Sequence, residues 1–137
     1  MAGYGMSTKL SGSLDEVKAR VVEALKTQGF GVLTEIDVQK TMQSKLGVDF
    51  KPYLILGACN PHFAYRALSA DEAIGLLLPC NVIVRQDDDG VAVSIQDPEV
   101  MFSVVDEQTK LSMQGFPQEV KKSLQAVLAL LSRETQK

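Results

Sequence analysis

Two stretches rich in Val and Ile, residues 81–85 and 91–95, flank the turn sequence Asp87-Asp88-Asp89-Gly90. β-Branched runs joined by a short turn with Asp and Gly are a strong local signal for a β-hairpin. The two strands of a hairpin pair antiparallel, so this chain cannot form an all-parallel sheet. The sequence therefore predicts an antiparallel or mixed sheet, and the acidic turn is expected to be a solvated hairpin tip.

Three further strands are expected, at residues 4–10, 30–38 and 51–58. Helix signals stand between and after them. Ser13 and Glu16 have capping-box spacing and precede an apolar stripe at three- and four-residue steps. Two Asn-Pro or Asp-Pro pairs put a capping residue before a Pro at the first helical position. The expected helices are one between Ser13 and Gly29, one over 37–46, one opened by Asn60-Pro61, one between Ser69 and Pro79, one over 99–105 after Asp97-Pro98, and one from Pro117 onward, with 107–115 as a loop.

The order of these elements is not a regular alternation of strand and helix. No repeat, low-complexity tract or linker divides the chain, so we expect a single domain over residues 1–137. A hairpin followed by a helical end favours the α+β class, with helices on one face of the sheet.

Composition excludes several classes of function. The formal net charge is −3, and the chain has no Trp and only 6% aromatic residues. Nucleic-acid binding usually needs a basic stripe or aromatic platforms, so neither nucleic acid nor an anionic membrane surface is an expected partner. The N-terminus lacks the pattern of a signal peptide, and the longest apolar run, 73–79, is too short to span a bilayer. A cytoplasmic location is expected.

The two cysteines, Cys59 and Cys80, are the most distinctive chemical feature of the chain. Cys59 precedes the Asn60 helix start, and Cys80 follows the helix-ending Pro79. A thiol near a helix N-terminus can have a lowered pKa and raised reactivity. Cys59 would then be a nucleophile or sulfur carrier, with Cys80 as the resolving or orienting group. The alternative is that both are small buried apolar residues, as free cysteines commonly are.

A soft-metal site is a weaker alternative for the same residues. Cys59 and His62 have C-x-x-H spacing, and Cys80 could supply a third ligand for copper or zinc. Nothing in the sequence compels a fourth ligand. His62 is the only His in the chain, and it is expected to be a solvated side chain in the first turn of a helix.

Two carboxylates, Glu35 and Asp37, share one face of an expected strand because side chains alternate along a strand. Such a pair can share a proton or bind a cation. It can equally mark the solvated face of a sheet. The functional interpretation gains weight only if these residues converge on Lys45, Arg66 or the cysteines.

Four segments resemble, in order and spacing, the bacterial and archaeal family called "domain of unknown function 302". They are EIDVQ at 35–39, KLGVDF at 45–50, LGACNP at 56–61 and LLLPCNV at 76–82, within a resemblance over about residues 4–132. The positions that match the family pattern are Glu35, Asp37, Gln39, Lys45, Gly47, Cys59, Asn60, Pro61, Pro79 and Cys80. His62 and Tyr65 depart from it, since Pro and His stand there in the family pattern. This departure weakens a shared metal role for His62.

The resemblance implies a fold of the TATA-binding-protein-like kind, with a curved, mainly antiparallel sheet of about five strands packed on helices. It also implies frequent homodimers, and it implies no activity. No catalytic constellation in the sequence is complete, so the interpretation leans away from an enzyme and expects no cofactor.

We therefore expect a non-catalytic homodimeric module that binds a small molecule or a protein. The candidate binding residues are Glu35, Asp37, Lys45, Cys59, Asn60 and Cys80. Thiol redox or sulfur-transfer chemistry at the two cysteines stays the alternative.

Overall fold

The computed structural model describes residues 3–135 and has one five-stranded antiparallel sheet in the order β1-β5-β4-β3-β2. Every neighbouring pair is antiparallel, including the expected hairpin, whose register brings Asp87 opposite Gly90. The α+β class and the antiparallel five-stranded sheet predicted above are confirmed. The strands are β1 (Gly5–Leu10), β2 (Gly31–Asp37), β3 (Tyr53–Cys59), β4 (Cys80–Asp87) and β5 (Gly90–Gln96).

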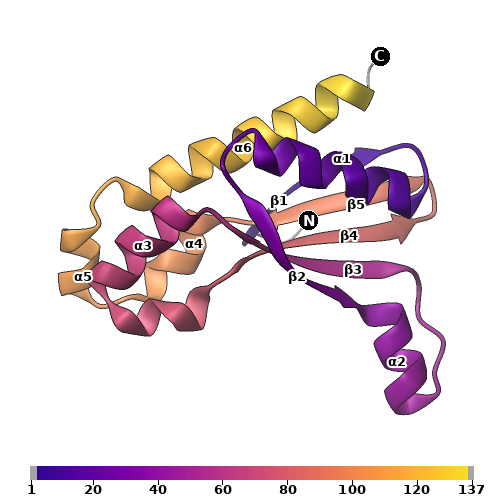
Figure 1. Ribbon diagram of the computed structural model, residues 1–137, viewed down its shortest axis with the longest axis horizontal. Helices are drawn as coiled ribbons and strands as arrows, with labels where there is room; N and C mark the ends of the chain where they lie inside the picture. Colours follow the sequence, from indigo (N-terminus) through magenta and orange to yellow (C-terminus); the bar gives the residue numbers. More distant parts are fainter. Residues whose placement is uncertain (1–2, 136–137) are drawn as a thin grey trace.

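Two long helices cover one face of the sheet, α1 (Leu14–Lys26) and α6 (Phe116–Thr135) (Figure 1). The capping box of α1 forms as expected. The Ser13 hydroxyl accepts a bond from the Glu16 amide (3.1 Å), and the Glu16 carboxylate accepts one from the Ser13 amide (3.2 Å). The apolar stripes of both helices are buried against the sheet: Val17, Val21 and Leu25 from α1, and Val120, Leu124, Val127 and Leu131 from α6.

Among residues 3–135, no helix covers the other face of the sheet, which we call the open face. Side-chain alternation sends one set of strand residues to the helices and the other set to the open face. The helix-facing set is almost fully buried. It comprises Leu54, Leu56, Ala58, Val82, Val84, Val91, Val93 and Ile95. The open face alternates with it and mixes polar residues such as Ser7 and Ser94 with half-buried apolar ones such as Ile55 and Ile83.

Several short helices gather beyond the ends of β3, β4 and β5, on the left of Figure 1. Burial of Ala67, Ile74 and Phe102 joins this group to the main core. Its members are α3 (Pro61–Ala70), the 3-10 helix η1 (Glu72–Leu77), α4 (Pro98–Met101), the 3-10 helix η2 (Phe102–Val104) and α5 (Glu107–Ser112).

Two sequence expectations in this group are wrong. Ser69 does not open a helix, because α3 continues through it to Ala70, and Asp71 caps η1 by accepting from the Ala73 amide (3.0 Å). The segment expected as a loop contains α5. Asp106 caps α5 by accepting from the Thr109 amide (2.8 Å). In both cases a nearby Asp supplies the cap. The sequence analysis assigned the first cap to Ser69 and overlooked the second.

β2 has a β-bulge between Val32 and Thr34, which places Thr34 opposite Gly57 of β3. The side chain of Thr34 then fills the space above Gly57. A Cβ atom built on Gly57 would overlap Thr34 Oγ1 and lie 2.8 Å from Pro79 Cγ. Gly57 is therefore required by this close approach of three segments.

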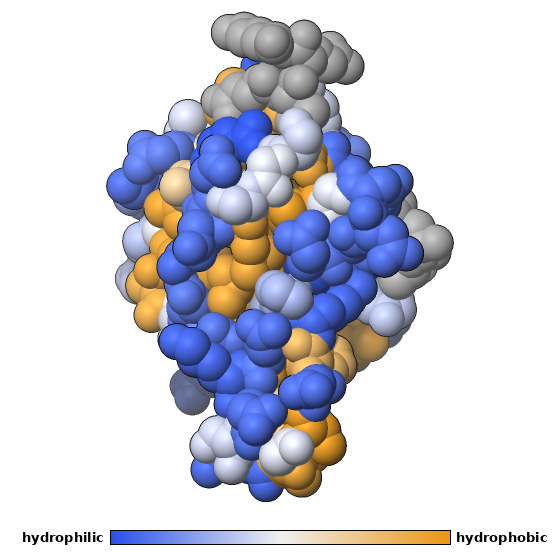
Figure 2. Space-filling model, turned by 90° about the vertical axis from the view of Figure 1, so that its right-hand side faces the viewer, coloured by the Kyte–Doolittle hydropathy of each residue, from blue (hydrophilic) through white to orange (hydrophobic). Residues whose placement is uncertain are grey.

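The helix α2 (Val38–Leu46) lies apart from the helical layer and has no buried residue. We call α2 with the following segment to Phe50 the α2 arm. Leu46, Val48 and Phe50 are all exposed, by 69%, 45% and 41%. Figure 2 views the molecule from the side on which the α2 arm lies. At the bottom of this view, hydrophobic surface is exposed among hydrophilic side chains. In the described part of the chain, no helix combines the length and apolar character needed to cross a bilayer.

Candidate functional site

A cavity of about 350 Å³ lies where the ends of β2, β3 and β4 meet the short helices. We call it the strand-end cavity. Its walls come from segments far apart in sequence: the start of β2, the β3–α3 junction, the η1–β4 junction, η2 and the start of α6. The lining is almost wholly apolar: Phe30, Leu33, Thr34, Ala58, Cys59, Asn60, Phe63, Ala64, Ala67, Leu68, Gly75, Leu78, Pro79, Cys80, Phe102, Phe116 and Val120.

Four of the five phenylalanines of the chain line this cavity and contact one another in series. The ring centroids of Phe30 and Phe63 are 6.0 Å apart, those of Phe63 and Phe116 are 5.8 Å apart, and those of Phe116 and Phe102 are 5.5 Å apart. The last two pairs are edge-to-face, an arrangement that stabilises aromatic clusters beyond their buried area. Arg66 covers Phe116 from outside, with its guanidinium carbon 4.9 Å from the ring centroid.

Both cysteines line the cavity, as free thiols. The β3–β4 register pairs Cys80 with Ala58, so Cys80 starts on the helix-covered face of the sheet. Cys59 is the next residue along β3 and starts on the opposite face. The two cysteines thus share one end of the sheet, but their side chains leave the strands in opposite directions.

Burial is the main influence on the pKa of the Cys80 thiol, since the residue is only 8% exposed. Burial, with a smaller contribution from the nearby Cys59, raises the pKa of Cys80 to about 11, against a hydrogen bond with Gln96 that lowers it. A thiol with this pKa is almost wholly protonated at neutral pH, so it is neither a ready nucleophile nor a ready metal ligand.

Asn60 lies at the cavity, but its side chain is already engaged in capping α3. Its Oδ1 accepts from the amides of His62 (3.0 Å) and Phe63 (3.3 Å), and its Nδ2 donates to the Gln28 carbonyl (3.1 Å). The backbone carbonyl of Asn60 accepts from the Ala64 amide. Because Pro61 has no N–H, the first turn of α3 has no donor left to stabilise a Cys59 thiolate.

The other candidate residues lie away from the strand-end cavity, since none of them lines it. Glu35 and Asp37 do share a face of β2, as predicted, but each has its own partner. Glu35 forms an ion pair with Lys18 of α1 (2.5 Å), and Asp37 caps α2 by accepting from the Lys40 amide (3.0 Å). Lys45 lies in the last turn of α2. The convergence on the cysteines that would have favoured a functional interpretation of Glu35 and Asp37 does not occur.

His62 is exposed in the first turn of α3 and does not line the cavity, although Cys59 and Cys80 do. Among residues 3–135, no group of three or more His, Cys, Asp or Glu side chains lies close enough together to hold a metal ion. The trio of Cys59, His62 and Cys80 is therefore not assembled in this structure.

The sequence model of the family described as "Domain of unknown function DUF302" matches residues 6–131. The chain belongs to the DUF302 family. The crystal structure of an uncharacterized conserved DUF302 protein from Bacillus stearothermophilus is similar to it, with 30% sequence identity and a TM-score of 0.82. That similarity covers 95% of this chain and 99% of the other. No curated protein matches the chain.

Within this DUF302 fold, sequence reading missed the aromatic part of the site. Phe102 and Phe116, which line the cavity, were not singled out. A signal was present in the composition, because Phe is scarce in the chain and each of these residues stands at or near a helix boundary. Contacts between such distant positions follow only from the packing of α4, η2 and α6.

Proposed function

We propose that this DUF302 chain is a binding module that holds a small apolar molecule in the strand-end cavity. The main support for this proposal is the cavity itself, which has a volume of about 350 Å³ and is lined mostly by Phe, Leu, Ala and Val side chains. Cavities of this size and character are typical of small-molecule sites, in which apolar walls supply affinity and a few polar groups supply orientation. No described residue at the cavity has the activated nucleophile or acid–base pair of an enzyme.

A neutral fluorescent probe tests this proposal. N-phenyl-1-naphthylamine is expected to gain fluorescence in the wild-type protein with saturation at one probe per chain. Ala64→Leu places extra methyl groups against the cavity, since Ala64 is half-buried and lines it, and should weaken binding by about ten-fold or more. Ala19→Leu makes the same substitution at an exposed position of α1 and should leave binding unchanged. Equal binding by both variants would refute the proposal.

We also propose that the protein forms a homodimer through β2 and the α2 arm. β2 is an edge strand, and edge strands present unpaired backbone groups that natural proteins usually cover. Beside it, Ile36 and Leu46 are 48% and 69% exposed, and α2 buries no residue against its own chain. Apolar surface beside an edge strand suits a second copy of the same chain, which would need to bury about 800 Å² on each partner.

Sedimentation velocity tests the dimer. Leu46→Lys should shift the wild-type dimer to monomer, because a buried apolar contact becomes a charge. Leu76→Lys is the matched control, since Leu76 is 89% exposed in η1 at the other end of the molecule. A wild-type monomer at tens of micromolar, or dissociation by both variants alike, would contradict this proposal.

Thiol chemistry at Cys59 and Cys80 is less well supported than binding. The donors of the first turn of α3 are already used, and Cys80 is buried and protonated. Titration of the native protein with a chromogenic disulfide at pH 8 tests this reading. We expect Cys59 to react slowly and Cys80 to react only after denaturation. Rapid reaction of Cys80 in the native state would revive the thiol hypothesis.

A further inference from the structure

The open face of the sheet holds a second and larger hollow, separate from the strand-end cavity. This open-face groove has a volume of about 770 Å³ and runs across β1, β5, β4 and the start of β3. No residue lines both hollows. Tyr4 and Met101 lie at one side of the groove, and Tyr53 lies at the other.

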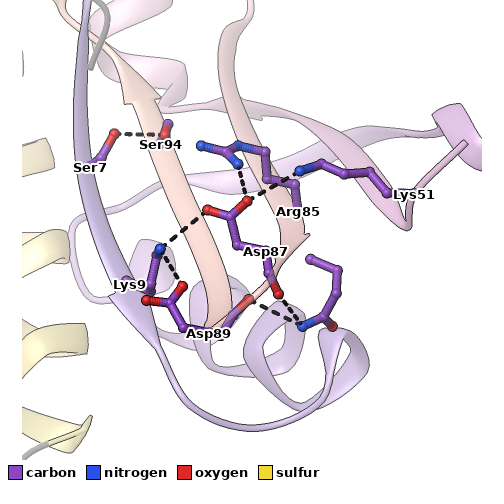
Figure 3. Close-up of polar contacts among 9 residues, drawn as sticks. Ser7, Lys9, Lys51, Arg85, Asp87, Asp89 and Ser94 are labelled. Carbon is purple, nitrogen blue, oxygen red and sulfur yellow. Dashed lines mark hydrogen bonds and ion pairs between the residues drawn. The ribbon is translucent and has the colours of Figure 1, made fainter.

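The polar residues of the groove come from three adjacent strands. Ser7 of β1 and Ser94 of β5 are directly opposite each other, and their hydroxyls are hydrogen-bonded at 2.7 Å. Arg85 of β4 extends over the sheet between Asp87 and this hydroxyl pair (Figure 3). Lys9 of β1 lies on the same face, one alternation beyond Ser7.

Charge at this end of the groove is unbalanced. Asp87 accepts from three cations at once: Arg85 at 2.8 Å, Lys9 at 3.2 Å and Lys51 at 3.2 Å (Figure 3). Asp89 pairs with Lys9 at 2.7 Å. Among the residues that line the groove, two cations, Lys9 and Arg85, stand against the one carboxylate of Asp87, which leaves a surplus of one positive charge in a chain whose formal net charge is −3.

This cluster also corrects the expectation of a solvated hairpin tip. Asp88 and Asp89 are exposed, but Asp87 forms ion pairs with three cations and only 26% of its side chain is exposed. One carboxylate cannot use all the donors of the three cations around it. Arg85 lines the groove and gives Asp87 one nitrogen, Nη1, so its guanidinium has further N–H donors.

A guanidinium, an ammonium and two hydroxyls on one concave surface are the groups that proteins use to bind phosphate and carboxylate oxygens. Ile83 and Tyr53 line the groove beside them and offer apolar surface for the body of such a ligand. The volume of the groove is within the range of small-molecule sites. The opposite charge of an oxyanion matches the local surplus, whereas a cation or a neutral apolar molecule does not.

We propose that the open-face groove binds a small organic oxyanion, a phosphate ester or a carboxylate, through Arg85, Lys9 and the Ser7–Ser94 hydroxyl pair. The ligand differs in chemistry from the apolar molecule of the strand-end cavity, and its site lies on the uncovered face of the sheet. One chain thus has two separate sites of opposite character.

The experiment is a heteronuclear NMR titration of the full chain with inorganic phosphate and with phenyl phosphate, at ionic strength held constant with sodium chloride. Saturable amide shifts are expected at Ser7, Arg85 and Ser94. Phenyl phosphate should bind more tightly than inorganic phosphate, by about three-fold or more, because the ring adds buried apolar area. Signals from Phe30, Phe63 and Ala67 of the strand-end cavity should not move.

Two substitutions separate ligand binding from general charge. Arg85→Gln removes the guanidinium and should weaken phenyl phosphate binding by about ten-fold or more, the usual effect of losing a charged hydrogen bond. Lys51→Gln is the matched control, because Lys51 also pairs with Asp87 but does not line the groove, and it should change affinity less than about two-fold. If Arg85→Gln does not fold, Ser94→Ala should weaken binding instead.

Four results at a single protein concentration would overturn the proposal. These are the absence of saturation, the same shifts with chloride alone, equal weakening by Arg85→Gln and Lys51→Gln, and no gain in affinity for phenyl phosphate. Shifts that follow protein concentration and not phosphate would also overturn it, because they would mean that a second copy of the chain covers the open face.

Discussion

Cys80 lies directly opposite Ala58 in the β3–β4 ladder, at the rim of the strand-end cavity. This pairing settles the environment of Cys80. Its thiol starts on the helix-covered face and is buried, whereas Cys59 starts on the other face one residue along. The two cysteines of this DUF302 chain therefore line the same cavity, but their side chains have different surroundings.

The buried Cys80 thiol predicts a loss of stability at alkaline pH. Its pKa is raised from 9.0 to about 11 in the folded protein, so the unfolded chain loses the proton first. The stability contributed by the neutral thiol is complete below pH 9 and is lost as the pH rises toward 11, amounting to about 2–3 kcal/mol. Urea unfolding should show this fall in the wild type and in Cys59→Ala, but not in Cys80→Ala. Parallel profiles for wild type and Cys80→Ala would exclude it.

Gly57→Ala is predicted to destabilise the fold by about 1–3 kcal/mol, the usual cost of overpacking. The new methyl group would collide with Thr34 Oγ1 and Pro79 Cγ. Gly31→Ala in β2 is the control, because a Cβ there has no atom within 4 Å among the described residues. Thermal unfolding followed by circular dichroism should separate the two, and adding Thr34→Ala should partly restore Gly57→Ala. Equal melting temperatures for both single variants would contradict the account.

The ion cluster around Asp87 predicts a change in the acid limb of stability. Hydrogen bonds from Lys51 and Lys9, with the charge of Arg85, lower the pKa of Asp87 below its ordinary value of 3.8. The stabilisation is present above pH 3.8 and is lost as the pH falls through the lower folded pKa. Asp87→Asn should therefore reduce the free energy of unfolding at pH 7, and its deficit should shrink below pH 4.

Asp88→Asn, at the exposed turn tip, is the control for Asp87→Asn. It should leave the free energy of unfolding unchanged at both pH values. A deficit for Asp87→Asn that stays constant from pH 7 to pH 2 would mean that the ionised carboxylate is not the source of the stabilisation.

Asn60 is predicted to be a structural residue of the cavity wall. Asn60→Ala removes the cap of α3 and the bond to Gln28, and should lower the free energy of unfolding by about 1–3 kcal/mol. Asn60→Asp keeps a capping oxygen but loses the donor to Gln28, so its loss should be smaller. Chemical denaturation measures both. If the two variants were equally destabilised, the cap would not be the main contribution of Asn60.

Local signals in the sequence were sufficient for much of the fold. The capping box of Ser13, the Asn60-Pro61 helix start and the Val/Ile hairpin each depend on neighbours a few residues apart, and each forms as predicted. The Ser69 cap failed because Asp71, two residues later, is a competing cap. α5 was missed because its six residues have only a weak apolar pattern.

The candidate site was only partly predictable. The place of each cysteine at a strand–helix junction followed from its neighbours in sequence: Cys59 ends β3 and Cys80 begins β4. The Phe cluster could not be predicted in this way. Phe30 and Phe116 are far apart in sequence, and each contacts Phe63 only because the chain folds. The grouping of Lys9, Lys51 and Asp87 could not be predicted either. It depends on the register of β1 against β5 and on the course of the chain before β3.

The most direct test of the central claim is a set of methyl nuclear Overhauser effects from bound N-phenyl-1-naphthylamine to the assigned protein. The account predicts contacts from the probe to the methyl groups of Ala64, Ala67 and Leu78, which line the strand-end cavity. Contacts confined to Leu46 and Val48 of the α2 arm, or no contact to the cavity methyls at saturating probe, would contradict it.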